Sequence, residues 1–279
     1  MYHPTTRQQE GFKGSPIARD ILGYWEVIEK IVKECDVILE VLDARMPEIS
    51  RNEQIEKLVK DYSKELIFVM NKADLISRME LEKRRKELRK IADCVYVSST
   101  NDYDLRKLKA LLFKDFSEIK NRFGKLKIGI VGYPNTGKSS LINALTKRKS
   151  AKVSKRAGTT HGVQWIKFGE NALIMDSPGV IPIGERDIIS EGLLGAKDPE
   201  RIPNAELVAF KIIEIGLKRN RNALEKFFDI NINDPDNDPQ IIIEQIAIKR
   251  NYLKKGGLPD INRAVIYIIR SWTGGELRF

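Results

Sequence analysis

The sequence predicts an α/β protein, with a six-stranded, doubly wound sheet and a smaller all-helical domain after it. Short apolar runs alternate with amphipathic helical patterns as far as about residue 186. Beyond that point strand signals fade, and three stretches of helical periodicity remain. A Gly-rich pattern of the phosphate-binding type, Gly132 to Ser139, lies between an apolar run and a helical pattern, as that fold requires.

The first half of the chain supplies three expected strands and four helices. The apolar runs 37–42, 66–70 and 94–97 are short and continuous, which is typical of buried parallel strands. Trp25, Ile28 and Ile31 recur at helical spacing, and Pro47 marks a loop after the first strand. Helices are expected over residues 24–34, 52–62, 79–91 and 105–122.

The second half completes the sheet and then turns helical. A strand over 126–131 leads into the Gly-rich pattern and a helix over 136–145, and 163–168 with 172–175 form a hairpin. Helices follow over 204–217, 239–253 and 260–272, and Gly256-Gly257 supplies a helix stop. The predicted domains are an irregular arm over 1–20, the sheet domain over 21–186 and the helical domain over 187–279.

Composition limits the class of protein. With 42% hydrophobic residues in 279, the chain can bury a substantial core, and it contains no apolar run of membrane-spanning length. Its start, MYHPTTRQQEGFKG, lacks the apolar core of a signal peptide. Cys35 and Cys94 lack the spacing of a disulfide framework or zinc site and are expected to be buried. We expect a cytoplasmic, monomeric protein with no membrane partner.

The positive charge is unevenly distributed. The net charge is +10, yet residues 190–279 contain 14 Lys/Arg against 13 Asp/Glu, so the excess lies in the first two thirds. Lys147 to Arg156 has six cations in ten residues. Such a run is either a solvated face or a contact for a polyanion such as RNA.

Gly132 to Ser139 fits the pattern G-x-x-x-x-G-K-[ST]. Its glycines allow backbone N–H groups to surround phosphate, and the helix that follows presents its positive end. We expect Thr136, Gly137 and Ser140 to line the phosphates, Lys138 to reach the β and γ phosphates, and the Ser139 hydroxyl to bind Mg²⁺.

A second motif specifies the base. Asn71-Lys72-Ala73-Asp74 follows an apolar strand, and the Asp74 carboxylate can accept hydrogen bonds from guanine N1–H and the exocyclic amine. Adenine lacks that donor pair, which indicates GTP and GDP and argues against an ATPase. Ser98-Ser99 follows the next strand, where a backbone amide and a hydroxyl can meet guanine O6.

Two later segments complete the expected magnesium and γ-phosphate site. Asp176 ends an apolar strand, where its carboxylate can hold a Mg²⁺-bound water, and Gly179 can donate its amide to the γ-phosphate. Thr160 can close over Mg²⁺ when the γ-phosphate is present, with Thr159 as the alternative.

The motif order resembles that of a known family. Asn-Lys-x-Asp and Ser-Ser precede the P-loop here, and Gly158-Thr159-Thr160 and Asp176–Gly179 follow it. This order resembles the circularly permuted ribosome-assembly GTPases of the YlqF/RbgA type, within the TRAFAC class. Asp43-Ala44-Arg45 resembles that family's signature after its first strand, and 257–264 resembles the start of its last helix.

The resemblance covers about residues 22–275 and implies a circularly permuted P-loop GTPase sheet, GTP hydrolysis, and large-subunit ribosomal RNA as the partner. It leaves the catalytic group open. Val180 stands where Ras-like GTPases have a water-positioning glutamine, and Gly23-Tyr24-Trp25 contains no histidine before the first helix. His161 is a weak candidate, against the alternative of an exposed loop histidine. Asn135 is either a ligand for K⁺ or a residue that stabilises the loop.

Two other functions compete with a large-subunit assembly GTPase. One is a GTP-dependent RNA-binding scaffold with negligible intrinsic turnover, which the missing glutamine and histidine favour. The other is a small-subunit assembly GTPase of a second permuted branch. Its members carry an oligonucleotide-binding barrel or a zinc-binding cysteine cluster, and this sequence indicates neither.

Overall fold

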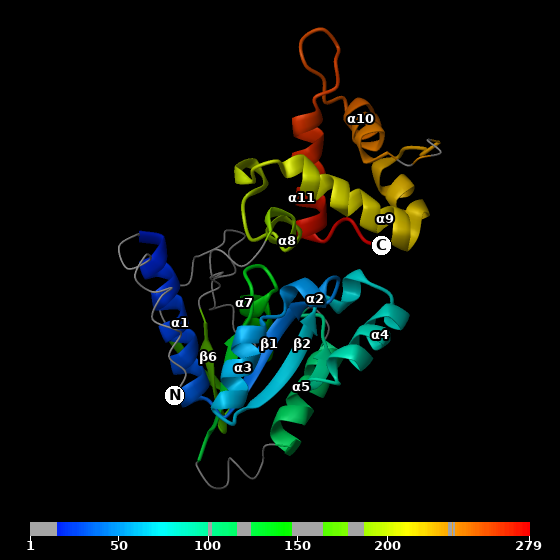
Figure 1. Ribbon diagram of the computed structural model, residues 1–279. Coiled ribbons are helices and arrows are strands. Elements are labelled where there is room, and N and C mark those ends of the chain that lie inside the picture. Colours follow the sequence, from blue (N-terminus) through cyan, green and yellow to red (C-terminus); the bar gives the residue numbers. More distant parts are fainter. Residues whose placement is uncertain are drawn as a thin grey trace. The chain divides into compact units, whose positions relative to one another are not determined.

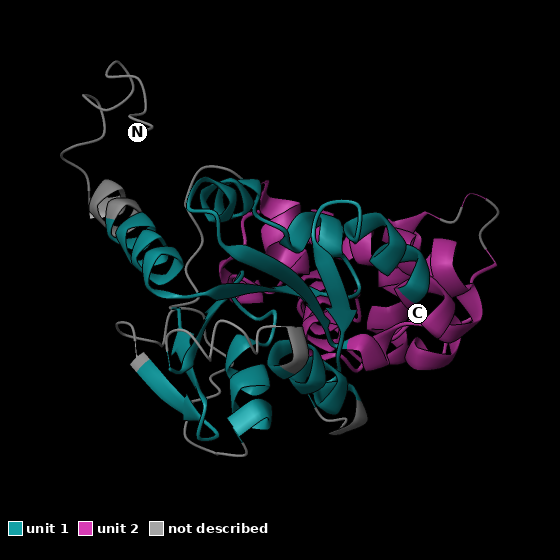
Figure 2. Ribbon diagram, turned by 90° about the horizontal axis from the view of Figure 1, so that it is seen from below, with its two compact units in different colours: residues 1–72, 82–185 teal, residues 73–81, 186–279 magenta. Residues whose placement is uncertain are grey.

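The computed structural model describes residues 16–99, 102–115, 124–146, 164–177, 187–233, 236 and 238–279. The chain divides into two compact units, coloured separately in Figure 2. The sheet unit comprises Met1–Lys72 and Glu82–Glu185, and the helical unit comprises Ala73–Leu81 and Arg186–Phe279. The boundary therefore passes through the Asn-Lys-x-Asp motif, between Lys72 and Ala73.

The sheet unit is built on six strands in the order β3-β2-β1-β4-β6-β5 (Figure 1). They are β1 (Val37–Asp43), β2 (Glu65–Asn71), β3 (Asp93–Tyr96), β4 (Leu126–Val131), β5 (Gln164–Phe168) and β6 (Ala172–Asp176). Neighbours pair parallel except β5 and β6, which form the predicted hairpin. The strand order runs outward in both directions from the β1–β4 pair, and ligands of such sheets bind where the order reverses.

Helices cover both faces of this sheet, which confirms the doubly wound prediction. On β1, Ile38 joins a core that contains Ile28 of α1 (Pro16–Glu34) and Ile55 of α3 (Glu53–Asp61). Its neighbour Leu39 points to the other face and joins a core with Leu108 of α5 (Asp102–Asp115), and with α7 (Lys138–Thr146). The short helix α2 (Pro47–Ser50) and α4 (Arg78–Leu88) follow β1 and β2.

The described part of the helical unit packs α8 (Ile188–Leu193), α9 (Ala205–Phe228), α10 (Pro239–Lys249) and α11 (Ile261–Gly274) around apolar side chains. The sequence predicts the last three of these helices but not α8. Short 3₁₀ turns lie at Ala73–Leu75 and Pro199–Arg201. Trp272 of α11 is 1% exposed, and its indole Nε1 donates to the Leu193 carbonyl at 2.9 Å. A hydrogen bond of this kind satisfies the polar atom of a buried indole.

Several predicted boundaries are wrong. Helix α1 begins at Pro16, inside the segment expected to be irregular, because proline is tolerated in a first helical turn. Proline also starts α2 at residue 47, where we expect a loop. Helix α9 continues past 217 through a kink at Asn220, whose side chain accepts from Ala223 N. Helix α10 ends at Lys249, so Gly256-Gly257 lies in a loop rather than at a helix stop.

Two expectations from composition can be compared with the structure. Cys35 and Cys94 are both buried, as predicted, and both are free thiols. Within the described ranges, no helix has the length and apolar character needed to cross a membrane.

Candidate nucleotide-binding site

The P-loop connects β4 to α7 at the carboxyl edge of the sheet. Lys138 is 6% exposed, and its ammonium donates to the carbonyls of Gly132 at 2.7 Å and Tyr133 at 2.8 Å. The Thr136 hydroxyl also donates to Tyr133 O, at 2.9 Å. The lysine therefore lies folded back along the loop, and the first turn of α7, which carries half-buried Ser139 and Ser140, begins beside it. This is the geometry of an anion cradle at a helix N-terminus.

Two glycines are required by close approaches rather than by turn formation alone. Gly132 has φ 140°, and a Cβ there would lie 2.5 Å from the Val41 carbonyl oxygen of β1. Gly137 has φ 95°, and its Cβ would collide with the side-chain amide of Asn71. Asn135 also has a left-handed backbone, with φ 60°, which asparagine adopts more readily than most residues. The loop is thus held close to β1 and β2.

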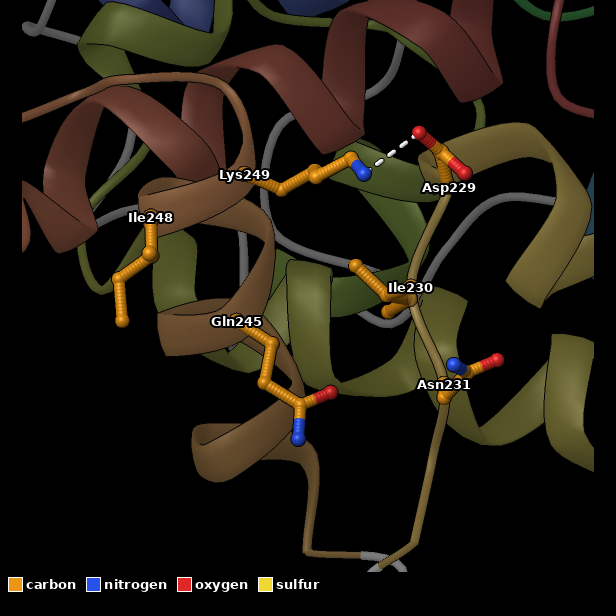
Figure 3. Close-up of a pocket in the computed structure, with 6 residues that line it drawn as sticks. All are labelled: Asp229, Ile230, Asn231, Gln245, Ile248 and Lys249. Atoms are coloured by element: carbon orange, nitrogen blue, oxygen red, sulfur yellow. Dashed lines mark ion pairs between the residues drawn. The ribbon is translucent and has the colours of Figure 1, made fainter.

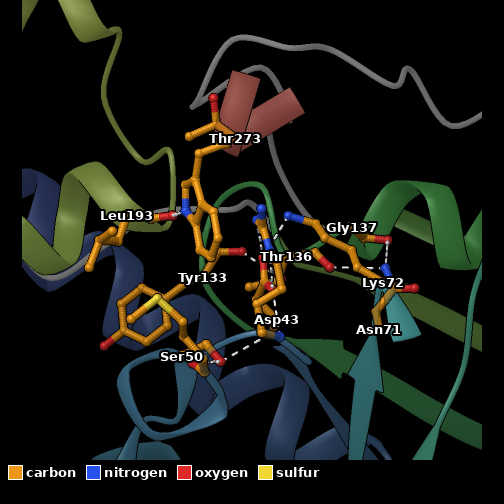
Figure 4. Close-up of polar contacts among 12 residues, drawn as sticks. Asp43, Ser50, Asn71, Lys72, Tyr133, Thr136, Gly137, Leu193 and Thr273 are labelled. Carbon is orange, nitrogen blue, oxygen red and sulfur yellow. Dashed lines mark hydrogen bonds and ion pairs between the residues drawn. The ribbon is translucent and has the colours of Figure 1, made fainter. Parts of the chain in front are cut away.

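Asn71 connects the base motif to the phosphate motif (Figure 4). Its Nδ2 donates to the Thr136 carbonyl at 2.9 Å, and its Oδ1 accepts from the Ser99 hydroxyl at 2.9 Å. Asn71 is 2% exposed and lies at the end of β2, while Ser99 follows β3. Asn71, which the sequence assigns to the nucleotide, therefore connects the end of β2 to the segment after β3 and to the P-loop after β4.

Lys72 is bound to a carboxylate that the sequence left without a role. Its Nζ lies 2.8 Å from Asp43 Oδ2, and Arg45 binds the same carboxylate through Nε at 3.0 Å and a terminal nitrogen at 2.7 Å. Burial raises the pKa of Asp43, but the charges of Lys72 and Arg45 and their hydrogen bonds outweigh it and hold that pKa well below its usual range. Asp43 is therefore ionised at neutral pH.

Asp176, at the end of β6, and Lys138, at the start of α7, are both buried charged residues. Asp176 is 6% exposed and pairs with Ile130 in the β4–β6 register. Burial raises the pKa of Asp176 to about 6, although the Lys138 charge lowers it, and burial lowers the pKa of Lys138 to about 8. Asp176 Oδ1 is buried, and no hydrogen-bond partner for it exists among the described residues.

The surroundings of Asp176 Oδ1 indicate whether the site fits a magnesium ion. A buried carboxylate oxygen without a donor is costly unless a cation or water completes it. Hard oxygen ligands from Asp176 and the Ser139 hydroxyl, next to a phosphate cradle, are the donor set that Mg²⁺ prefers. The residues present therefore fit Mg²⁺.

The residues assigned to the base follow β2 and β3. Asp74 lies exposed in the Ala73–Leu75 turn, with its carboxylate open to solvent, and Ser98 is 3% exposed at the end of β3. Asp74 belongs to the helical unit by its contacts, whereas Asn71 and Lys72 belong to the sheet unit. Its assignment to guanine remains a prediction.

Several features singled out in the sequence lie outside the described residues. They are Thr159, Thr160, His161, Gly179, Val180 and the basic run 147–156. Within the described part, the structure brings Asn71, Ser99, Thr136, Gly137, Lys138 and Asp176 to one edge of the sheet. Sequence reasoning missed the contacts of Asp43 and Arg45. Their position directly after a strand, at the same edge as Asn71, was the available signal.

The helical unit contains a pocket that differs from the P-loop site. It has a volume of about 250 Å³ and is lined by Asp229, Ile230, Asn231, Gln245, Ile248 and Lys249 (Figure 3). Lys249 and Asp229 form an ion pair at 2.6 Å across it, and Ile248 is 60% exposed. No glycine is among its lining residues, and the Lys249 charge is paired with Asp229, so this pocket lacks the features of the P-loop site.

Comparison with protein families gives two matches. The model described as RsgA GTPase matches residues 25–184, and the model described as 50S ribosome-binding GTPase matches residues 127–245. The first covers more than half of the chain and contains all the nucleotide-binding motifs discussed above.

Curated relatives match most of this chain. The uncharacterized GTP-binding protein MJ1464 of Methanocaldococcus jannaschii is 36% identical over 254 residues, covering 91% of this chain and 66% of the relative. The GTPase grn1 of Schizosaccharomyces pombe is 31% identical, covering 92% of this chain and 61% of its own length. The chain thus spans less than two thirds of the length of these relatives.

A solved structure shares the fold. The GDP-bound structure of TM YlqF superposes with a TM-score of 0.59 at 25% identity, covering 90% of this chain and 95% of that one. The match extends over the helical residues as well as the sheet, and it supports the predicted fold class.

Proposed function

Because the chain belongs to the circularly permuted, YlqF-like GTPases, we propose that it binds GTP with Mg²⁺ and hydrolyses it to GDP and phosphate. We further propose that it acts in assembly of the large ribosomal subunit, by binding ribosomal RNA, as a cytoplasmic monomer. The strongest support for nucleotide and Mg²⁺ binding is the P-loop, in which the buried Lys138 ammonium donates to the loop carbonyls. Near it, the buried oxygen Oδ1 of Asp176 has no hydrogen-bond partner among the described residues.

Each predicted site residue has a distinct part in this proposal. The P-loop amides and Lys138 bind the phosphates, and Asn71 keeps that loop against β2. Ser139 and Asp176 hold Mg²⁺, which when bound neutralises negative charge on the phosphate oxygens. Asp74 selects guanine, with Ser98 and Ser99 beside the base. Thr160 and Gly179 sense the γ-phosphate.

No described side chain positions the attacking water. We therefore propose that hydrolysis by the isolated protein is slow and that the ribosomal particle, a potassium ion held by Asn135, or His161 completes the site. The scaffold alternative predicts GTP-dependent RNA binding with no stimulated turnover.

The large subunit is the partner that the comparisons favour. One matching family model is described as a 50S ribosome-binding GTPase, and it covers P-loop, Asp176 and part of the helical unit. The basic run 147–156 is the proposed RNA contact, since phosphate contacts from six cations give strong, salt-dependent binding.

The test measures phosphate release from GTP with no particle, with purified large subunits and with purified small subunits. We expect stimulation by large subunits only, and none with Lys138→Ala. GTP-dependent binding to large subunits without stimulated release would establish the scaffold alternative. Stimulation by small subunits alone would contradict the proposed partner.

Guanine selection has its own test. Asp74→Asn replaces an acceptor with an amide that can donate to the xanthine carbonyl, so nucleotide preference should shift from GTP toward XTP. Calorimetric titration of both nucleotides measures this shift. Equal GTP affinity in wild type and variant would show that Asp74 does not read the base.

A further inference from the structure

The motif Asp43-Ala44-Arg45 has no part in the nucleotide binding and hydrolysis proposed above. The Asp43 side chain is 3% exposed and accepts hydrogen bonds from several directions. Arg45 contributes a two-point contact through its guanidinium and a further bond from its own backbone N–H, at 3.0 Å. The Asp43 backbone N–H donates to the Ser50 hydroxyl at 3.0 Å. These bonds hold Asp43 and its carboxylate in place independently of Lys72.

The remaining contact of Asp43 is to the lysine of the base motif. Lys72 Nζ lies 2.8 Å from Asp43 Oδ2, and the lysine side chain is 20% exposed. Register makes this contact possible, because Asp43 pairs with Asn71 across β1 and β2. A fixed, buried carboxylate thus holds a partly exposed ammonium at the strand end.

Lys72 also has an unusual backbone. Its φ is 62°, in the left-handed region that costs a residue with a Cβ roughly 1 kcal/mol or more. Asn71, just before it, is bound to the P-loop carbonyl of Thr136, and Ala73-Asp74 comes directly after it. The conformation of Lys72 therefore sets the direction in which the chain leaves β2 toward Asp74.

We propose that Asp43 is a positioning residue for guanine selection: it holds Lys72, and through it the backbone that carries Asp74, in the conformation that binds the base. Arg45 orients the Asp43 carboxylate for this task. The inference rests on the proposed function, since it assigns a further determinant to the same nucleotide site.

A single cation is enough to neutralise a carboxylate that serves only the stability of the fold, whereas Asp43 binds both Lys72 and Arg45. Glu56 and Arg51 provide the comparison within the sheet unit, because Arg51 also makes a two-point contact to Glu56, at 2.8 and 2.7 Å. Glu56 lies in α3 and touches no residue of the base motif in any contact described above. Glu56→Gln is therefore the matched control for Asp43→Asn, with the same loss of charge at the same kind of pair.

The experiment compares the affinities for GTP and ITP, because hypoxanthine lacks the exocyclic amine that Asp74 would bind. Wild type should prefer GTP by roughly tenfold or more. Asp43→Asn should lower that preference at least threefold, while Glu56→Gln stays within twofold of wild type. A ratio in Asp43→Asn equal to that of wild type would overturn the proposal, whatever the loss of overall affinity or stability.

A second variant covers the case in which Asp43→Asn does not fold. Lys72→Met leaves the Asp43–Arg45 pair intact and should lower the GTP preference to a similar degree. Where both single variants fold, the double variant should have the ratio of Lys72→Met. A normal ratio in Lys72→Met, or additive losses in the double variant, contradicts the inference. Failure of wild type to bind GTP at all would instead defeat the proposed function.

Discussion

The two units bury different kinds of side chain. At one edge of its sheet, the sheet unit buries Asp43, Arg45, Asn71, Lys138 and Asp176, each at most 6% exposed. Among the described residues of the helical unit, the buried polar side chains are Glu191 and Ser271, and the core is otherwise apolar.

This difference separates stability from function. Burying a charge costs free energy unless partners compensate it, so a cluster of buried charges marks a place kept for binding or chemistry. An apolar helical core lowers the free energy of the folded chain without such a cost. Substitutions in the helical core should therefore act on stability alone, whereas those at the sheet edge should act on nucleotide binding and, through the buried charges, on stability as well.

The largest expected effect lies in the helical core. Trp272→Ala removes a side chain that is 1% exposed and leaves a cavity, so the free energy of unfolding should fall by about 3–5 kcal/mol. Denaturant unfolding measures this loss. Trp165, 41% exposed on β5, is the control, and its alanine variant should lose much less. Equal losses of stability in the two alanine variants would contradict the distinction between a packed helical core and an exposed strand.

Asp176→Asn should make the nucleotide-free protein more stable. Because burial raises the pKa of Asp176 from 3.8 to about 6, its favourable contribution is present below pH 4 and is lost as the pH rises through 6. Above pH 7, without Mg²⁺, the variant should gain at most about 3 kcal/mol. Unfolding measured from pH 4 to 8 should show the two proteins converging at the acid end. A constant difference over this range would contradict the assigned pKa.

Lys138→Ala should abolish most nucleotide affinity while the protein stays folded. A lost charge-assisted contact to phosphate costs on the order of 2–3 kcal/mol. Calorimetry with GTP and Mg²⁺ measures the effect. Lys127, an exposed lysine near the start of β4, the strand that leads into the P-loop, is the control and should tolerate alanine. A loss below threefold in Lys138→Ala would show that the P-loop is not the phosphate site.

The smallest effect concerns potassium. Asn135 lies in the P-loop with its backbone in the left-handed region, and it either binds K⁺ or only stabilises the turn. Phosphate release should be severalfold faster in KCl than in NaCl, and Asn135→Ala should flatten that difference. Identical wild-type rates in the two salts would assign Asn135 to the loop alone.

The sequence by itself determined the features that depend on near neighbours. Short apolar runs place β1 to β4 and β6, since a buried parallel strand has that composition wherever it lies in the sheet, and the hairpin pattern places β5. The P-loop pattern places Lys138 and Ser139 because glycines, lysine and hydroxyl act within eight consecutive residues. Motif order alone identified the permuted arrangement. Helix boundaries at Pro16, Asn220 and Lys249 were missed, since neighbouring packing decides where a helix stops.

Only the tertiary structure decided which distant residues meet. Asn71 reaches Thr136, and Lys72 reaches Asp43, because β1 lies between β2 and β4 in a fixed register. The raised pKa of Asp176 likewise arises from burial, which its neighbours in sequence do not specify. Contacts across a sheet depend on strand order, and desolvation depends on everything packed around a group. Both are properties of the folded chain, so a motif can name the residues of a site but not the partners that hold them.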